Sequence, residues 1–440
     1  MNRLIYRLLI SSALILAGIS SRAQFLMDML DTTKDLGRSN IDLLKRFEHV
    51  RMAGYMQPQY QVASEKGAKS FNGGDFQANS NNRFMIRRGR FRIDYVKTDK
   101  LRRPELQFAF QIDGTERGVF IRDYWGRLWE NKFEMFSFAM GMFARPFGFE
   151  VNYSSADRES PERGRMSQTL MKTERDLGFM TIFEFRKSTA KWKFFRIDAG
   201  IFNGQGLTGP SEFDSYKDFI TQLVIKPLHL SSSLTLSGGV TMFYGGLAQV
   251  TKYTYRMKEQ SGIIDFTADS TSSLPGQKLP RQYYGSNAQL KYKSRWGITE
   301  LRGEYWKGTQ TSTQLSSETP GTLPTLPNGT FAPYFIRPFN GAFFYLLQNI
   351  VNTKHQIGLK FDWYDPNTRV EGTVIGSPNT HFSPADIKYS TIGAGYTYYM
   401  DENVKFVFWY EWVKNEITSL PGYTTDLRDN VFTLRVQYRF

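Results

Sequence analysis

The sequence predicts an all-β fold: a transmembrane antiparallel β-barrel of sixteen strands, within a range of 14 to 18. Three observations predict it. Polar and apolar residues alternate from residue 49 onward, in segments of about ten residues. Aromatic residues make up 15% of the chain although its mean hydropathy is only −0.43, so many rings need an apolar environment outside an ordinary core. The connections between segments are alternately short and long, as in barrels whose rims face different compartments.

The N-terminal residues predict export. Arg3 and Arg7 form a positive start, an apolar stretch runs from residue 8 to residue 19, and the small residues Ser21 and Ala23 fit a cleavage site. Residue 24 is Gln rather than Cys, so nothing indicates a lipid-modified N-terminus. We expect three parts of the chain: a signal peptide over residues 1–23, a short periplasmic extension over 24–48 and the barrel over 49–440.

Composition argues against several other classes of protein. The chain has no cysteine, so disulfide bonds do not hold it, and its four histidines lack metal-ligand spacing. No later segment offers about 20 consecutive apolar residues, which excludes helical membrane spans. Ser, Asp and His residues form no local catalytic pattern, and the basic residues are interleaved with strand-like segments rather than clustered. We therefore predict no enzymatic activity, no cofactor, no metal and no nucleic-acid partner.

The alternation assigns each segment one apolar and one polar face. In "RFRIDYV", Phe91, Ile93 and Tyr95 share one face, and the opposite face carries arginines and an aspartate. The same pattern recurs along the chain in "ELQFAFQID" (105–113), "EMFSFAMGMF" (134–143), "HQIGLKFDWY" (355–364) and "NVKFVFWYEWV" (403–413). One face suits hydrocarbon and the other suits water, as the wall of a membrane barrel requires.

The connections assign the two rims. Short connections are expected near 98–103, 130–133, 187–192, 227–233, 294–296, 351–353 and 400–403. Long ones are expected near 63–82, 144–175, 203–217, 245–282, 308–338, 365–386 and 415–429. The connection near 114–118 is short where the pattern calls for a long loop. Segment 339–350 is almost continuously apolar and could be helical. The short turns predict the periplasmic rim, where an even strand count also places both ends of the barrel.

Several stretches, taken in order, resemble the phosphate-selective porin O and P family of Gram-negative outer membranes. They are "RRGRFRIDYV" (87–96), "GMFARPFGFE" (141–150), "ERDLGFM" (174–180), "GIFNGQG" (200–206), "KDFITQLVIKP" (217–227), "LKFDWYDPN" (359–367) and "ADIKYSTIGAGYTYY" (385–399). The resemblance implies a sixteen-stranded, homotrimeric outer-membrane porin whose third long loop folds inward and narrows the pore.

The candidate site residues are basic and lie on one strand and one loop. Arg88, Arg90 and Arg92 share the polar face of the second strand, and Arg158, Arg163 and Arg165 lie in the long loop 144–175. Lining a pore, guanidinium groups would concentrate anions and bind phosphate or carboxylate in a bidentate manner. The alternative is a structural wall in which they pair with carboxylates. Arg302, between Glu300 and Glu304, favours pairing.

The C-terminus is predicted to be the closing strand of the barrel. Apolar residues occupy alternate positions up to the last one: Phe432, Leu434, Val436, Tyr438 and Phe440. We expect this set to face lipid and to form the C-terminal signal for the barrel assembly machinery, a role that resemblance to outer-membrane barrels implies. The segment should pair with the first strand, because a membrane barrel tolerates no open edge.

These observations predict an outer-membrane porin: a passive channel for small hydrophilic solutes with a preference for anions such as phosphate. Its expected partners are outer-membrane lipid, small anionic or polar solutes, the assembly machinery and two further copies of the chain. One alternative is a structural or accessory barrel whose pore is plugged by its loops. A second is a soluble extracellular β-sandwich that binds glycans, in which the aromatic faces would form a core.

Overall fold

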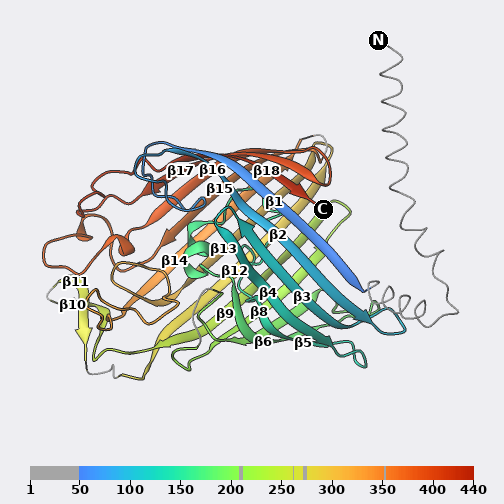
Figure 1. Ribbon diagram of the computed structural model, residues 1–440, viewed down its shortest axis with the longest axis horizontal. Coiled ribbons are helices and arrows are strands. Elements are labelled where there is room, and N and C mark those ends of the chain that lie inside the picture. Colours follow the sequence, from blue (N-terminus) through green and yellow to red (C-terminus); the bar gives the residue numbers. More distant parts are fainter. Residues whose placement is uncertain (1–48, 208–211, 261, 271–274, 351–352) are drawn as a thin grey trace, which may run out of the picture.

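The computed structural model describes residues 49–207, 212–260, 262–270, 275–350 and 353–440 (Figure 1). The expected signal peptide, residues 1–23, and the expected periplasmic extension, residues 24–48, lie outside these ranges. The regular secondary structure of the described ranges is almost entirely β-strand.

In the described ranges, eighteen strands form one sheet that closes on itself and is antiparallel apart from one short pairing. Their bounds are β1 Val50–Ala63, β2 Asn82–Thr98, β3 Pro104–Thr115, β4 Gly118–Trp129, β5 Phe136–Ala144, β6 Arg175–Glu184, β7 Phe195–Phe202, β8 Asp218–His229, β9 Leu234–Ala248, β10 Thr254–Gln260, β11 Ile263–Asp269, β12 Lys278–Ser294, β13 Gly297–Ser312, β14 Phe335–Asn349, β15 His355–Asp365, β16 Tyr389–Tyr399, β17 Val404–Asn415 and β18 Val431–Arg439. The helical elements are α4 (Arg165–Leu170) and the single turns η1 (Gly372–Val374) and η2 (Pro384–Asp386).

Sixteen of these strands make the barrel wall, which confirms the predicted fold. Each wall strand pairs with its neighbours in sequence, β9 pairs with β12, and β1 pairs with both β2 and β18. Strands β10 and β11 form a separate hairpin within the connection from β9 to β12, touching the wall through a two-residue parallel pairing with β14. The sequence reading treated residues 245–282 as a loop. That reading was wrong for this hairpin, which extends from the rim (Figure 1).

The period-two pattern separates an outer apolar face from an inner one. On β5, Met140 is 70% exposed on the outside, whereas Ser137 is 1% exposed on the inside. Phe408 and Trp412 of β17 likewise face out, and Trp409 and Glu411, which lie between them in the sequence, face in. An apolar, aromatic outer belt on a closed barrel is the surface that a lipid bilayer covers. The chain is therefore a transmembrane β-barrel.

The two rims differ as the connection lengths predict. Short turns join β2 to β3 and β16 to β17, whereas long loops join β5 to β6 and β13 to β14. The link between β3 and β4 is only residues 116–117, the predicted exception. Segment 339–350 belongs to strand β14, so the helical alternative is wrong. It is apolar on both faces because its inner face packs against a loop inside the barrel.

No helix in the described ranges is long and apolar enough to cross a membrane.

The seam between β1 and β18 ends on the last residue. Gly54 and Phe440 exchange two backbone hydrogen bonds, of 3.2 and 3.0 Å, and the Phe440 ring lies over Gly54 and 6.3 Å from the ring of Phe91. A side chain at position 54 would collide with that ring. The terminal aromatic therefore covers the junction of the first, second and last strands.

Replacing Phe440 by alanine should lower the amount of folded protein in the outer membrane severalfold. The backbone pairing with Gly54 can persist, but the ring that covers the seam is lost. The measurement is the fraction of protein that migrates as the compact, heat-modifiable species on a gel. Ile417→Ala, on an exposed loop, serves as the control. Equal folded fractions for the two variants would contradict a role of Phe440 in assembly.

Candidate functional site

A β-bulge concentrates arginines on the inner face of β2. The register between β1 and β2 shifts between Met56 and Pro58, so that Arg87 and Arg88 together oppose the single residue Gln57. Both side chains consequently reach the lumen, and Arg90 and Arg92 continue the inner row. The bulge adds one cation to the row that strict alternation predicts.

A second bulge acts in the same way on β4. The register between β3 and β4 shifts between Gln111 and Ile112, and the extra residue on β4 is Arg122. Arg122 and Asp123 are both buried inside the barrel. Arg122 donates to Glu174 at 2.5 Å and lies 3.7 Å from Asp113. The two bulges thus place additional guanidinium groups on neighbouring strands of the same wall.

The loop of residues 145–174 folds into the lumen and packs against the opposite wall. The Phe147 ring stacks on Trp306 of β13 with 3.8 Å between centroids and 10° between planes. The Glu304 carboxylate accepts backbone N–H groups of Phe149 and Glu150 at 2.8 and 2.9 Å. Gly148 has φ +61° and lies so close to Glu304 that any larger residue would clash. These contacts anchor the start of the loop, and Met166, Leu170 and Met171 extend the same buried cluster.

Carboxylates bind the other side of the loop of residues 145–174, called the lumen loop below, to the barrel wall. Their partners are arginines on β2, β4 and β18, called the arginine wall below. Glu162 binds Arg88 of β2 at 2.6 Å, Arg435 of β18 at 2.9 Å and Arg87 at 2.9 Å. Glu174 binds Arg122 and the loop's own Arg163, at 2.5 and 2.7 Å. The surrounding guanidinium charges outweigh burial and hold the pKa of both carboxyls well below the usual value. Both therefore stay ionised, and the loop is clamped between two walls.

Two cavities remain beside the clamped loop, and they share Arg90 and Arg163. The outer cavity, about 430 Å³, lies between the loop of residues 64–81, the arginine wall and the lumen loop. The inner cavity, about 290 Å³, lies nearer the periplasmic ends of β1 and β18. Arg90 donates to Asp113 and to Ser155 of the lumen loop, both at 2.8 Å, so the boundary between the cavities is held on both sides.

The two cavities differ in charge. The outer one has six basic and five acidic residues in its lining: Arg87, Arg88, Arg90, Arg122, Arg163, Lys172, Asp75, Asp113, Glu162, Glu174 and Glu318. The described lining of the inner one has five arginines and no carboxylate: Arg90, Arg92, Arg163, Arg175 and Arg439. Their partner carboxylates lie behind them; Asp94, for example, takes two N–H groups of Arg92, at 2.6 and 2.8 Å. A guanidinium has five N–H donors, so donors remain for the cavity.

The six arginines singled out from sequence occupy three kinds of place. Arg88, Arg90 and Arg92 face the lumen, each paired with a carboxylate, and Arg163 lines both cavities. The pairing expected for Arg302 is present with Glu300, at 2.5 Å, although Glu304 binds the loop backbone instead. Pore lining and ion pairing therefore coexist in the same side chains.

Arg158 and Arg165 line neither arginine cavity. Arg158 is 4% exposed, and its three guanidinium nitrogens have no hydrogen-bond partner among the described residues. Burial, together with the nearby charges of Arg163 and Arg88, lowers its pKa to about 9. Arg165 lies between the rings of Phe71 and Tyr389, at 4.2 and 3.5 Å, and so ties two loops to the wall. A role of Arg158 and Arg165 in handling anions stays a prediction.

Sequence reasoning missed Arg87 and Arg122. Both reach the lumen only through bulges, which leave no mark in a period-two pattern. Arg175 begins β6 and binds Asp123 at 3.3 Å across the wall. Arg435 and Arg439 of β18 bind Glu162 and Asp157 at 2.9 and 3.0 Å. The described residues contain no cluster of three or more His, Cys, Asp or Glu side chains suited to a metal.

The five C-terminal residues expected to face lipid lie on the outer face of the barrel, unlike the arginines. Phe432, Leu434 and Val436 are half-buried on the outer face, whereas Tyr438 and Phe440 are exposed. The intervening Thr433, Arg435 and Gln437 are buried inside the barrel. This placement agrees with a lipid-facing set, and its use as an assembly signal stays a prediction.

Comparisons with known proteins identify the fold class. No protein-family model and no curated protein sequence matches the chain. Solved structures do match the chain. OprB of Pseudomonas putida shares 10% identity and a TM-score of 0.55, covering 93% of this chain and 98% of that one. The outer membrane channel DcaP of Acinetobacter baumannii shares 10% and 0.51, covering 89% and 97%. The anion-selective porin of Comamonas acidovorans shares 10% and 0.50, covering 89% and 99%.

The shared feature is the outer-membrane porin fold: a closed barrel of sixteen strands. This agrees with the fold that the sequence predicts. The narrower resemblance to the phosphate-selective O and P family is not among these matches.

Proposed function

We propose that this chain is an outer-membrane porin, a passive and non-enzymatic diffusion channel for small hydrophilic solutes that prefers anions such as phosphate. One observation carries the anion preference: five arginines and no carboxylate line the described surface of the inner cavity. Guanidinium groups in a confined, partly dehydrated space attract anions and bind phosphate or carboxylate oxygens in pairs. The two similar structures described as a channel and as an anion-selective porin support the proposal.

The proposed path follows the arginine wall. A solute would enter the outer cavity between the loops, pass Arg90 and Arg163, and leave through the inner cavity towards the periplasm. The near balance of charges in the outer cavity favours modest rather than strict selectivity. A homotrimer is part of the proposal, because the resemblance to the phosphate-selective porins implies one.

The structure also favours a second candidate. The lumen loop buries an aromatic cluster against β13, β14 and β17 and binds both walls. A barrel filled in this way could serve as a structural or accessory subunit with little conductance. The conductance measurement in a planar bilayer, described next, separates the two candidates.

The test is the reversal potential of the purified protein in a planar bilayer under a potassium chloride gradient. We expect open channels with anion selectivity. In Arg92→Gln, which removes a cation that takes no part in holding the lumen loop, the anion-to-cation permeability ratio should fall roughly two- to threefold. One charge about 5 Å from a solute in water is worth roughly 0.8 kcal/mol before screening by salt.

Lys100→Gln, in the exposed turn between β2 and β3, is the matched control and should leave the ratio unchanged. Absence of conductance would reject the channel in favour of the accessory barrel. Cation selectivity would reject the anion preference alone.

A further inference from the structure

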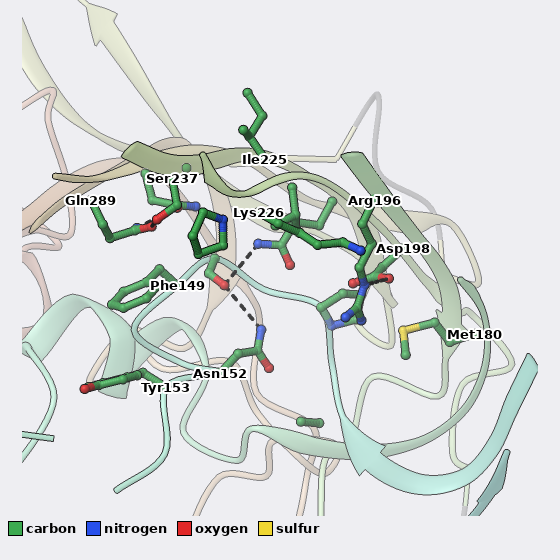
Figure 2. A pocket seen from close by; sticks show the side chains of 18 residues that line it. Phe149, Asn152, Tyr153, Met180, Arg196, Asp198, Ile225, Lys226, Ser237 and Gln289 are labelled. Carbon is green, nitrogen blue, oxygen red and sulfur yellow. Dashed lines mark hydrogen bonds and ion pairs between the residues drawn. The ribbon is translucent and has the colours of Figure 1, made fainter. Parts of the chain in front are cut away.

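A third cavity lies on the other side of the lumen loop. It measures about 520 Å³ and opens between residues 146–153 and the inner faces of β6–β9 and β12, in the periplasmic half of the barrel (Figure 2). This volume is in the range typical of small-molecule sites. Arg92, Arg163 and the other arginines of the inner cavity do not line it.

The charged groups around this third cavity are already paired. Arg196 binds Asp198 at 2.7 Å, and Lys226 of β8 binds Glu184 of β6, two strands away, at 2.8 Å. Figure 2 shows Arg196 and Asp198 side by side at one end of the cavity. Both cations of the lining, Arg196 and Lys226, are neutralised by these partners, so this cavity lacks the excess of positive charge that the inner cavity of the arginine path presents to anions.

Four amide side chains supply both donors and acceptors. Asn152 and Gln222 each donate an N–H to the Gly148 carbonyl, at 3.3 and 3.1 Å. Gln289 donates to the Asn287 side-chain oxygen at 2.9 Å. Among the described residues, the Asn152 and Gln222 side-chain oxygens and the Asn287 amide nitrogen have no further partner. A cavity whose lining offers both acceptors and a donor matches hydroxyl groups, which both donate and accept, better than it matches an anion.

An aromatic pair forms the remaining wall. Phe149 and Tyr153 are one turn apart on the loop, since the Tyr153 N–H donates to the Phe149 carbonyl at 2.9 Å. Their rings stack with 5.1 Å between centroids and 22° between planes, beside the amides in Figure 2. An aromatic face covers the apolar C–H face of a sugar ring, whereas amides bind its edge.

We propose that this third cavity binds a neutral saccharide, with a sugar ring against Phe149 and its hydroxyls on Asn152, Gln222 and Asn287. The passage of such a sugar through the barrel rests on the proposed channel function, whereas its binding does not. The cavity then selects a second class of solute, beside the anions of the arginine path.

Binding of maltose and of glucose to the purified wild-type chain, measured by titration calorimetry, tests the inference. The detergent must be free of sugar, for example an amine oxide. Gln222→Leu and Asn287→Leu should each weaken binding about tenfold, because each removes hydrogen-bonding capacity at nearly constant size. Phe149→Ala should weaken it by a similar factor. Gln356→Leu, a luminal amide on β15 outside this cavity, is the matched control and should bind as wild type.

Maltose should also block the ion current in a planar bilayer, and the block should weaken in the same variants. Binding without any conductance would support the saccharide site and reject the channel. Conductance with no saccharide binding, or binding that is unchanged in Gln222→Leu and Asn287→Leu, would overturn the inference and leave the proposed channel intact. Heat-modifiable migration on a gel shows that each variant is folded before it is titrated.

Discussion

Replacing Glu162 by glutamine is expected to loosen the lumen loop and to raise the single-channel conductance. The Glu162 carboxylate is buried and binds Arg87, Arg88 and Arg435 on the two strands that flank β1. Its removal leaves three guanidinium groups inside the barrel without their shared counterion. Breaking a buried ion pair in this way costs about 3–5 kcal/mol, far more than loss of a surface pair. The thermal unfolding midpoint in detergent should fall, and current noise should rise as the loop moves.

Glu318→Gln is the matched control. Glu318 binds only Lys172, whose side chain is 68% exposed, and such pairs contribute about 0–1 kcal/mol. Because Glu318 also lines the outer cavity, the control is read on stability: it should keep the unfolding midpoint and the low current noise of the wild type. If Glu162→Gln behaves like Glu318→Gln, the ion pairs of Glu162 do not hold the loop in place.

Replacing Trp306 by alanine should release the other side of the same loop. Trp306 is fully buried, stacks on Phe147 and donates its indole N–H to Glu304, which in turn accepts the backbone of Phe149 and Glu150. Truncation of a buried tryptophan costs about 3–5 kcal/mol through lost contacts and the cavity left behind. We expect a lower unfolding midpoint, protease cleavage within residues 145–174 and a larger conductance.

Trp412→Ala separates this effect from the loss of any tryptophan. Trp412 lies on the outer face of β17 and is 48% exposed, so lipid or detergent replaces its contacts. Its unfolding midpoint should change little and its conductance should stay as in the wild type. Cleavage of the loop in Trp412→Ala, or an intact loop in Trp306→Ala, would show that the stacked pair does not anchor it.

Alternation and connection lengths were sufficient to predict the barrel. The lipid-facing and lumen-facing residues of β5, β15, β17 and β18 follow directly from the period of two, because one side of the wall meets hydrocarbon and the other meets water. The pattern was ambiguous at β14, where Phe343 and Leu347 face the lumen but pack against the loop. Because the lumen loop packs against β14, the inner face of this strand is as apolar as its lipid-facing side.

The candidate site was only partly predictable. Arg88, Arg90 and Arg92 could be placed in the lumen because they alternate with Phe91, Ile93 and Tyr95, which share the opposite face. Arg87 and Arg122 could not, since a bulge changes the face of a residue without changing the local composition. The partners of these arginines were also hidden, because Glu162 and Glu174 are more than 50 residues away in sequence. Loop-to-wall pairing is a property of the closed barrel and not of any segment.

The lumen loop joins the two ends of the barrel as well as filling it. Gln57 of β1 donates to the Ser155 carbonyl, Gln437 of β18 donates to the Ala156 carbonyl, and Arg435 of β18 donates to the Pro161 carbonyl, at 2.8, 3.0 and 2.6 Å. Residues 155–161 of the lumen loop therefore form hydrogen bonds with both the first strand and the last. Each of these hydrogen bonds needs both a seated loop and a closed seam, so the closure of the ring and the filling of its interior stabilise each other.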